Sequence, residues 1–226
     1  MGMGPTTAQQ DRLTMSMIGR RWYMHAGARV RGLRRDPVSY LKNPAGLVYT
    51  DVGGDYHASV RERMGFQEHG IELSDAAILQ CLTHKSFAHG SRPYNEKLNL
   101  LGSQYLKLQA AMHSVGPENS FGNLGTPVSK GLVSYQTAAE YVIAKNLEPL
   151  VFWKVSDPLN DGPIKGKSKV MSTVLNSFIG AILLQQGEKK ASQFIVEDLL
   201  NPSNTQSLLN ITLRKLDQQK ETVHSN

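Results

Sequence analysis

The 226-residue chain has little of several features that mark common classes of protein. It has one cysteine, Cys81, which excludes an internal disulfide framework and a multi-cysteine zinc site. Its longest apolar run, residues 172–184, is shorter than the ~20 residues of a membrane-spanning helix and contains Asn176 and Ser177. Strand signals are scarce as well. These absences favour a soluble, all-α protein without a membrane span, in which Cys81 is a small buried residue.

Familiar catalytic and nucleotide-binding motifs are also missing. The segment "GPIKGKS" ends like a phosphate-binding loop, but Asp161 stands where the template requires glycine, and no strand pattern precedes it. The seven histidines are dispersed, without a His-Glu-x-x-His pair, and there is no Gly-x-Ser-x-Gly elbow. His84 is expected to be a hydrogen-bonded helix residue. The sequence therefore shows no motif that would supply the nucleophile of a hydrolase.

Positive charge is concentrated near the N-terminus. Residues 12–35 contain seven arginines and no acid, whereas the net charge of the whole chain is +6, so the remainder carries −1. Such a segment is typical of a mitochondrial import sequence, of an arm that binds RNA phosphates, or of a solvated tail. The match of Met1, Gly2 and Thr6 to a myristoylation template is short and common. We predict RNA contacts for Arg20, Arg21, Arg29, Arg31, Arg34 and Arg35.

Proline, glycine and periodicity divide the chain into four predicted segments. A basic extension covers residues 1–36, a connector rich in proline and glycine covers 37–57, a helical domain covers 58–200, and a tail with an amphipathic helix covers 201–226. Helices are expected at residues 58–66, 75–88, from 95 onward, 127–146, 170–185 and 188–200. Ser74, Asn95 and Thr126 are the expected N-caps.

The helix that follows Asn95 has two distinct stripes. Its polar stripe presents Glu96, Asn99 and Ser103 at spacings of three and four residues. The other stripe is apolar and is expected to be buried; it consists of Leu98, Leu101, Tyr105, Leu108 and Met112.

These segments resemble a known family. "LTHKSFAHGSRPYNEKLNLLGSQYL" is similar to the ribonuclease III endonuclease signature, in which Leu-Thr-His-basic-Ser precedes Asn-Glu-basic-Leu-Glu-aromatic-Leu-Gly-Asp. "VSKGLVSYQTAAEYVIAKNL" resembles the family's next helix, and "KVMSTVLNSFIGAILLQQG" resembles the helix with Asp-x-x-Glu ahead of Ile-Gly-Ala. The resemblance runs in order from about residue 58 to 200. It implies a ribonuclease III-like helical domain.

The departures from the signature decide what the resemblance implies about activity. Family members cut double-stranded RNA with divalent metal held by carboxylates, and the matching positions here are neutral: Asn99, Ser103, Thr173 and Asn176. Magnesium relies on carboxylate charge, which amide and hydroxyl oxygens do not supply. Only Glu96 of the motif's acids remains. We therefore expect no bound metal, no cofactor and no cleavage, with Asn99 and Ser103 as ligands in an altered chemistry as the alternative.

The family resemblance also bears on partners. Its members dimerise through an apolar residue just before the Leu-Gly pair, here Leu100, which is smaller than the usual aromatic and implies a partner with a complementary pocket. Ordinary core is the other interpretation of Leu100. The ~26 residues after the domain are too few for the double-stranded RNA-binding domain that usually follows. We expect RNA contact from the arginines and from Lys165, Lys167 and Lys169, which equally suit an ordinary solvated loop.

A non-cutting domain of this kind with an import-like N-terminus resembles the ribonuclease III-like proteins of the fungal mitochondrial large ribosomal subunit. That resemblance implies a structural constituent of the mitochondrial ribosome, in contact with large-subunit rRNA and other ribosomal proteins. It also implies a heterodimer with a second ribonuclease III-like ribosomal protein. Two alternatives stay open: an RNA-processing or splicing accessory factor that binds structured RNA, and an active endoribonuclease that completes its metal site with a partner's acids.

Overall fold

The computed structural model describes residues 41–116, 120–155 and 166–224. The chain divides into one unit of residues 1–37 and another of residues 38–226, and the fold described below is that of the second unit. Within the described residues there is no β-strand, only two isolated bridges that join Lys42 to Val48 and Thr83 to Phe152. The prediction of an all-α fold is confirmed.

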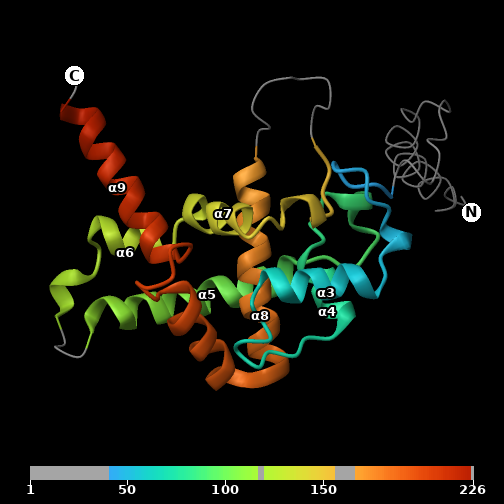
Figure 1. The fold of residues 1–226 in the computed structure, drawn as a ribbon, viewed down its shortest axis with the longest axis horizontal. Coiled ribbons are helices and arrows are strands. Elements are labelled where there is room, and N and C mark those ends of the chain that lie inside the picture. Colours follow the sequence, from blue (N-terminus) through green and yellow to red (C-terminus); the bar gives the residue numbers. More distant parts are fainter. Residues whose placement is uncertain (1–40, 117–119, 156–165, 225–226) are drawn as a thin grey trace, which may run out of the picture. The chain divides into compact units, whose positions relative to one another are not determined.

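Seven α-helices make up most of the described chain (Figure 1). They are α3 (Gly54–Arg63), α4 (Asp75–Cys81), α5 (Glu96–Val115), α6 (Pro127–Leu132), α7 (Tyr135–Ala144), α8 (Lys167–Phe194) and α9 (Leu208–His224). Short 3-10 turns lie at η1 (Tyr49–Asp51), η2 (Phe87–Gly90), η3 (Phe121–Asn123) and η4 (Glu148–Leu150), and a π-helical turn, η5 (Ile195–Leu199), follows α8.

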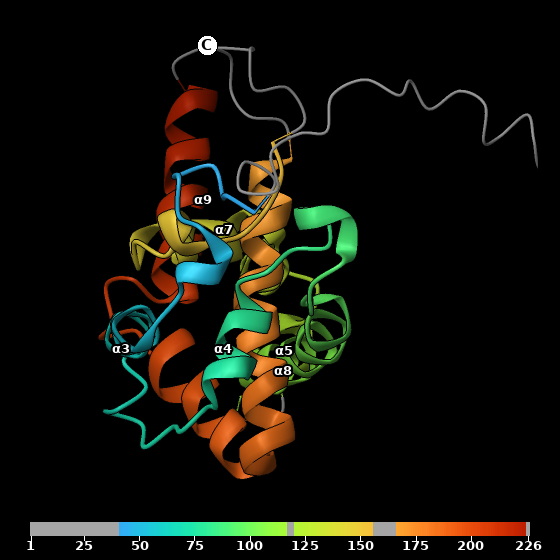
Figure 2. The same cartoon turned by 90° about the vertical axis from the view of Figure 1, so that its right-hand side faces the viewer.

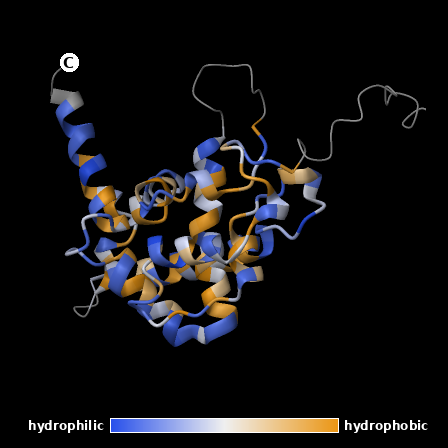
Figure 3. Ribbon diagram, turned by 45° about the vertical axis from the view of Figure 1, so that its right-hand side comes forward, coloured by the Kyte–Doolittle hydropathy of each residue, from blue (hydrophilic) through white to orange (hydrophobic). Residues whose placement is uncertain are grey.

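Helix α8 forms the centre of the domain. It packs against α5, α7 and α4, and Figure 2 shows α4 and α5 beside it. Apolar residues such as Leu175, Phe178 and Ile182 are fully buried along its length. The ring of Phe178 contacts Phe66 at 5.4 Å between centroids, which connects α8 to the loop after α3. Figure 3 shows hydrophobic residues gathered along these inner helices.

The segment Lys167–Leu199 is long and apolar enough to cross a membrane by length and composition alone. However, 61% of its most apolar window is buried inside the protein. Burial of that extent is what the packing of α5 and α7 against a core helix produces, because neighbouring helices remove its apolar side chains from water. We therefore interpret α8 as the core helix of the domain.

A buried polar network ties α7 to the chain after α8. The hydroxyl of Tyr141 donates to the Asp198 carboxylate, which also accepts from Asn204 Nδ2 at 2.8 Å and lies 3.8 Å from Lys145 Nζ. Burial raises the pKa of Tyr141 well above its ordinary value, and the nearby carboxylate raises it further. The buried carboxylate is thus satisfied by three partners, as a charge at such a site requires.

The helix expected at residues 75–88 ends earlier than predicted. Helix α4 ends at Cys81, and the chain just after it pairs with another segment. Phe152 N–H donates to Leu82 O, and His84 N–H donates to Phe152 O, both at 2.8 Å. Backbone groups that bond to a distant segment are no longer available to continue a helix. The first helix also starts earlier than expected, at Gly54 rather than residue 58.

Two of the three predicted N-caps are confirmed and one is wrong. Ser74 accepts from Ala77 N–H, and Thr126 accepts from Ser129 N–H, each at 3.3 Å. Asn95 precedes α5 but makes no side-chain cap bond. Its Nδ2 instead donates to Cys81 O and to Thr173 Oγ1, both at 3.1 Å. A tertiary contact therefore replaces the local one.

The single helix expected at residues 127–146 is two helices. Helix α6 ends at Leu132, and Ser134 has extended backbone angles of −74° and 144°. Its hydroxyl accepts from Thr137 N–H at 3.1 Å and so caps α7. The prediction missed this break because a serine inside an apolar helical pattern can either continue the helix or restart it as a cap.

The break expected between residues 185 and 188 is present as a kink within α8. Gly187 has φ 83° and ψ 177°, a conformation that a residue with a side chain rarely adopts. The helix continues directly on both sides of this residue. It also starts at Lys167, three residues before the expected start at 170.

The predicted buried stripe of α5 is only partly correct. Tyr105 is buried, whereas Leu108 is 54% exposed and Met112 is 60% exposed. The buried positions include Leu106 and Ala110 instead. The neighbouring helices cover a narrower face of α5 than its apolar residues span, so part of that stripe faces solvent.

The regions that flank the helical domain contact it. In the connector, Asn43 Nδ2 donates to Pro149 O at 2.8 Å, and the Tyr49 ring stacks on Phe87 at 5.4 Å. In the tail, α9 packs against α6 and α7 with Leu208 and Ile211 fully buried, and its far end extends away from them (Figure 1). The tail helix therefore packs at its start on its own domain.

Candidate functional site

Helices α5 and α8 cross in backbone contact at two glycines. A Cβ atom at Gly102 would lie 1.8 Å from Asn176 O, and one at Gly180 would lie 2.2 Å from Leu98 O. Both distances are far below any real contact, so only glycine permits this approach. The crossing brings Asn99 of the polar stripe against the face of α8 that carries Thr173 and Asn176.

The crossing pairs three of the four neutral signature positions across the two helices. Asn176 Nδ2 donates to Asn99 Oδ1 at 3.0 Å. Thr173 Oγ1 accepts from Asn95 Nδ2 at 3.1 Å and donates to Val170 O at 2.7 Å. Each of these side chains therefore has a partner within the protein.

Ser103, the fourth position, bonds within its own helix. Its hydroxyl donates to Leu100 O at 2.9 Å, and the side chain is half-buried. The structure thus brings Asn99, Thr173 and Asn176 into one polar contact region and leaves Ser103 one turn along α5. We call the set Asn95, Asn99, Thr173 and Asn176 the amide cluster.

The charge around the amide cluster is low. Glu96, the only acid that remains from the signature, lies 2.6 Å from Lys85 Nζ, and both side chains are about half exposed. The hydrogen bond to Glu96 raises the pKa of Lys85. Among the described residues, no group of three or more His, Cys, Asp or Glu side chains is placed to hold a metal ion.

His84 lies near this region, and its ring is hydrogen-bonded to a residue of its own turn. Its Nδ1 accepts from Ser86 N–H at 3.2 Å and lies 2.9 Å from Ser86 Oγ. Burial lowers the pKa of His84, and the neighbouring Lys85 lowers it further. The expectation of a hydrogen-bonded histidine is confirmed, although the residue lies after α4 rather than in a helix.

Cys81 is fully buried, and burial raises the pKa of its thiol. A buried thiol with a raised pKa carries little of the thiolate that a nucleophile or metal ligand requires. The prediction of a small buried residue is confirmed.

Leu100 lies on the surface, with 64% of its area exposed. The interpretation of Leu100 as ordinary core is therefore wrong. Leu108 and Met112 lie eight and twelve residues further along α5, about 80° and 120° around the helix axis from Leu100, so the three exposed residues lie within about a third of its circumference. We call them the α5 strip. Its role as a partner interface stays a prediction.

The basic residues predicted to bind RNA fall mostly outside the described residues, including Lys165 and the arginines Arg20, Arg21, Arg29, Arg31, Arg34 and Arg35. Lys167 and Lys169 lie in the first turn of α8. Lys167 Nζ is 2.6 Å from Glu148 Oε1, which balances its charge, whereas Lys169 is exposed. The two lysines thus differ in how available they are to a phosphate.

Several determinants of this region had no recognised signal in the sequence. The predictions did not single out Gly102 and Gly180, although each stands in a motif used for the resemblance. They also gave Asn95 a local role, whereas it joins α5 to α8. A glycine inside each of two apolar helices was the available indication in the sequence that these helices cross closely.

Comparisons with known proteins agree on one family. Residues 74–203 match the family described as "Ribonuclease-III-like". The chain is 27% identical to Ribonuclease 3 of Streptomyces coelicolor over 164 residues, which is 71% of this chain and 56% of that protein. It is 31% identical to Ribonuclease 3 of Mycobacterium bovis over 134 residues, 56% of this chain and 55% of that protein. The chain thus spans little more than half the length of these relatives.

One solved structure is also similar to this chain. The nuclease domain of ribonuclease III from Campylobacter jejuni is 26% identical, with a TM-score of 0.49. The match covers 61% of this chain and 94% of that structure.

Proposed function

The chain belongs to the ribonuclease-III-like family, and on that premise we propose that it is a non-cutting, RNA-binding constituent of the mitochondrial large ribosomal subunit. The proposed loss of cleavage rests on a single observation, the amide cluster. At the positions that match the family's metal-binding acids, the chain has Asn99, Ser103, Thr173 and Asn176. Three of these side chains are engaged with each other or with Asn95 and the backbone.

The residues present do not fit the divalent metal that the family uses. A hard dication loses its water reluctantly and needs carboxylate charge to compensate, and four neutral side chains provide about four fewer negative charges. The oxygen of Asn99 already accepts from the Asn176 amide. Metal-activated attack by water on a phosphodiester therefore has no support in this part of the chain.

The same cluster suits a structural role. Carboxylates at a close helix crossing repel each other unless a cation lies between them. A neutral amide pair joins the helices without a cation, and a hydrogen bond of this kind contributes about 1 kcal/mol. The crossing of α5 and α8 therefore becomes independent of metal.

The α5 strip supports the proposed protein partner. Leu100, Leu108 and Met112 are all more than half exposed and lie on one side of α5. Leu100 is at the position that, by family resemblance, inserts into a partner. We propose that a second ribonuclease III-like ribosomal protein covers this strip.

RNA contact is proposed for the basic residues. The exposed Lys169 lies at the start of α8, where the helix dipole favours anions, and Lys165 and Lys167 are close in sequence. The arginines of residues 12–35 supply most of the positive charge. Deletion of residues 12–35 is expected to weaken binding to structured RNA and to flatten its dependence on salt, because each lost phosphate contact removes about 0.9 from the salt slope.

The decisive experiment is sedimentation of the tagged protein from organelle extract. Co-sedimentation with the mitochondrial large subunit, together with crosslinks to one location in its rRNA, would support the proposal. Recovery in a ribosome-free fraction, with crosslinks to precursor or intron RNA, would instead support a processing or splicing factor.

A cleavage assay addresses the remaining alternative. The purified full chain, alone and with the captured partner, is incubated with duplex RNA and magnesium. We expect no cleavage in either case. Magnesium-dependent cleavage that requires the partner would show that the partner's acids complete a catalytic site, and would refute the non-cutting role.

A further inference from the structure

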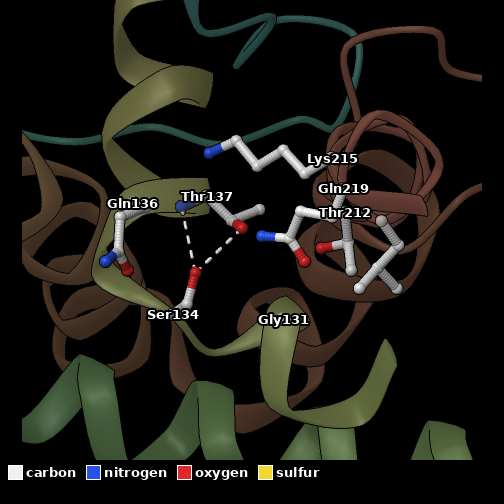
Figure 4. A pocket seen from close by; sticks show the side chains of 8 residues that line it. Gly131, Ser134, Gln136, Thr137, Thr212, Lys215 and Gln219 are labelled. Carbon is white, nitrogen blue, oxygen red and sulfur yellow. Dashed lines mark hydrogen bonds between the residues drawn. The ribbon is translucent and has the colours of Figure 1, made fainter. Parts of the chain in front are cut away.

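A cavity of about 360 Å³ lies between the start of α7 and the middle of α9, with α6 beneath it (Figure 4). The predictions from sequence assigned no site residue to these helices. The polar side chains that line the cavity are Ser134, Gln136, Thr137, Thr212, Lys215 and Gln219. This site is formed by α6, α7 and α9, whereas the amide cluster lies on α5 and α8.

The cavity lining includes one cation, whose charge is balanced by a carboxylate outside the lining. Lys215 is the one charged residue among the lining side chains, and no acid lines the cavity. Lys215 Nζ lies 2.7 Å from Glu140 Oε2, which is one turn along α7 from Gln136. An ammonium group that is held in place by a carboxylate outside the cavity can still donate its other hydrogens into it.

The start of α7 adds backbone donors. The first amides of an α-helix have no acceptor within the helix, and the helix dipole makes this end attractive to anions. The N–H of Thr137 is taken by Ser134 Oγ at 3.1 Å, and that of Ala138 by Ser134 O. The amide of Gln136, a residue that lines the cavity, precedes them and has no acceptor among the described residues.

Thr212 is the independent observation that points to a ligand. It is 2% exposed, and its hydroxyl has no hydrogen-bond partner in the described part of the chain. Its methyl group packs against Gly131, where a Cβ would lie 2.3 Å from Thr212 Cγ2. Thr212 lines the cavity, and its hydroxyl points toward the space between α7 and α9 (Figure 4). A buried hydroxyl without a partner is costly, so an acceptor in this space would stabilise it.

We propose that this cavity is a phosphate-binding site, which takes either a phosphodiester of RNA or a free phosphate. A phosphate offers several oxygen acceptors at once, which match an ammonium group, a hydroxyl and a backbone amide at the start of α7 arranged around one space. The RNA source rests on the proposed function, whereas the free-phosphate source does not.

The test uses the full chain labelled with ¹⁵N, titrated with inorganic phosphate and followed by amide chemical shifts. We expect saturable shifts at Tyr135 and Gln136. Lys215→Gln should weaken phosphate binding at least about tenfold, because it removes a charge-assisted hydrogen bond, and Thr212→Val should weaken it about threefold.

Two further variants separate binding from folding. Glu140→Gln breaks the same ion pair as Lys215→Gln but keeps the cation, so it should bind phosphate at least as tightly as the natural chain. Lys220→Gln removes a lysine of α9 that does not line the cavity, so it should leave the affinity unchanged. Amide spectra of all variants establish that each is folded.

The outcomes are distinct. The proposal is overturned if phosphate shifts neither Tyr135 nor Gln136, or if Lys215→Gln binds phosphate as tightly as the natural chain. A second titration uses a short RNA duplex. Weaker duplex binding by Lys215→Gln identifies RNA as the phosphate source, and equal binding identifies free phosphate. If phosphate binds but no variant and no natural chain binds RNA, the proposed function fails while the phosphate site stands.

Discussion

The α5–α8 crossing and the α7–α9 junction differ in whether their buried polar side chains have hydrogen-bond partners. At the crossing, Asn99, Thr173 and Asn176 are all paired, and the backbones touch at Gly102. At the junction, a cavity lies between the packed helices, and the Thr212 hydroxyl has no partner among the described residues. A polar region that is closed by internal hydrogen bonds serves packing, whereas one that is left open has donors to offer to a ligand.

The largest effect is expected from closing the space at the crossing with a methyl group. Gly102→Ala places a Cβ 1.8 Å from Asn176 O, so α5 and α8 must separate, and the free energy of unfolding should fall by at least about 3 kcal/mol. Urea denaturation measures the change. Gly122→Ala is the matched control, since a Cβ there meets nothing within 4 Å. Equal effects of the two variants would show that the helices do not touch as described.

Restoring the acids tests whether the crossing has become independent of metal. The variant Asn99→Glu, Ser103→Asp, Thr173→Asp and Asn176→Glu should lose about 2 kcal/mol without divalent ions, because the new carboxylates repel each other. Magnesium or manganese should recover much of this loss. Thermal denaturation with and without metal measures both effects, and an equal response of the natural chain to magnesium would contradict the non-catalytic proposal.

One substitution made at both regions compares them directly. Thr173→Val removes a hydroxyl that both accepts and donates, so the free energy of unfolding should fall by about 1–2 kcal/mol. Thr212→Val removes a buried hydroxyl without a partner, so stability should stay the same or rise by up to about 1 kcal/mol in phosphate-free buffer. A loss at both positions would mean that Thr212 is bonded within the chain.

The amide pair is expected to contribute a smaller amount. A double-mutant cycle with Asn99→Ala and Asn176→Ala should give a coupling free energy of about 0.5–1.5 kcal/mol, the range of a neutral hydrogen bond. The cycle is measured by urea denaturation. Additive single effects would indicate that the two amides do not interact in solution.

The smallest effect concerns pH. Because burial holds the pKa of His84 below its ordinary value of 6.5, the neutral form is favoured in the folded protein. This contribution is present above pH 6.5 and is lost as the pH falls through the folded pKa. His84→Asn keeps an acceptor for Ser86 N–H. Between pH 7 and about 5, its free energy of unfolding should fall by a few tenths of a kcal/mol less than that of the natural chain, which denaturation at each pH measures. Identical pH profiles would remove His84 as a contributor.

Local features were predictable from the sequence because their causes are local. Ser74 and Thr126 cap helices through bonds to amides three residues away, so the motif alone determines the contact. The kink at Gly187 follows from glycine between two helical patterns. The all-α fold follows from periodicity that extends over most of the domain.

The features that were missed depend on residues far apart in the chain. Asn95 bonds to Thr173, 78 positions away, rather than to the start of its own helix. Helix α4 ends at Cys81 because the following chain pairs with Phe152. Hydrophobicity shows which residues of α5 favour burial. The neighbouring helices cover only part of that face, and Leu108 lies outside the covered part.

The candidate site was predictable only in part, for the same reason. Sequence spacing indicated which positions replace the family's acids, but the pairing of Asn99 with Asn176 depends on the crossing angle and approach of two helices. The cavity beside Thr212 depends on the break at Ser134, which turns α7 toward α9. Neither arrangement has a signature within a short window of sequence.

The buried residues of helix α9 lie near its start, and this asymmetry should produce a gradient of local opening. Ser207, Leu208 and Ile211 are fully buried, whereas Asp217, Gln218 and Lys220 are exposed. Amide hydrogens near the buried end should exchange with solvent slowly, and those toward the C-terminus should exchange progressively faster, since fraying begins where tertiary contacts are few. Helix α9 is therefore rigid near its N-terminal end and opens more easily toward its C-terminal end. A partner that binds the C-terminal end can consequently move relative to the rest of the domain.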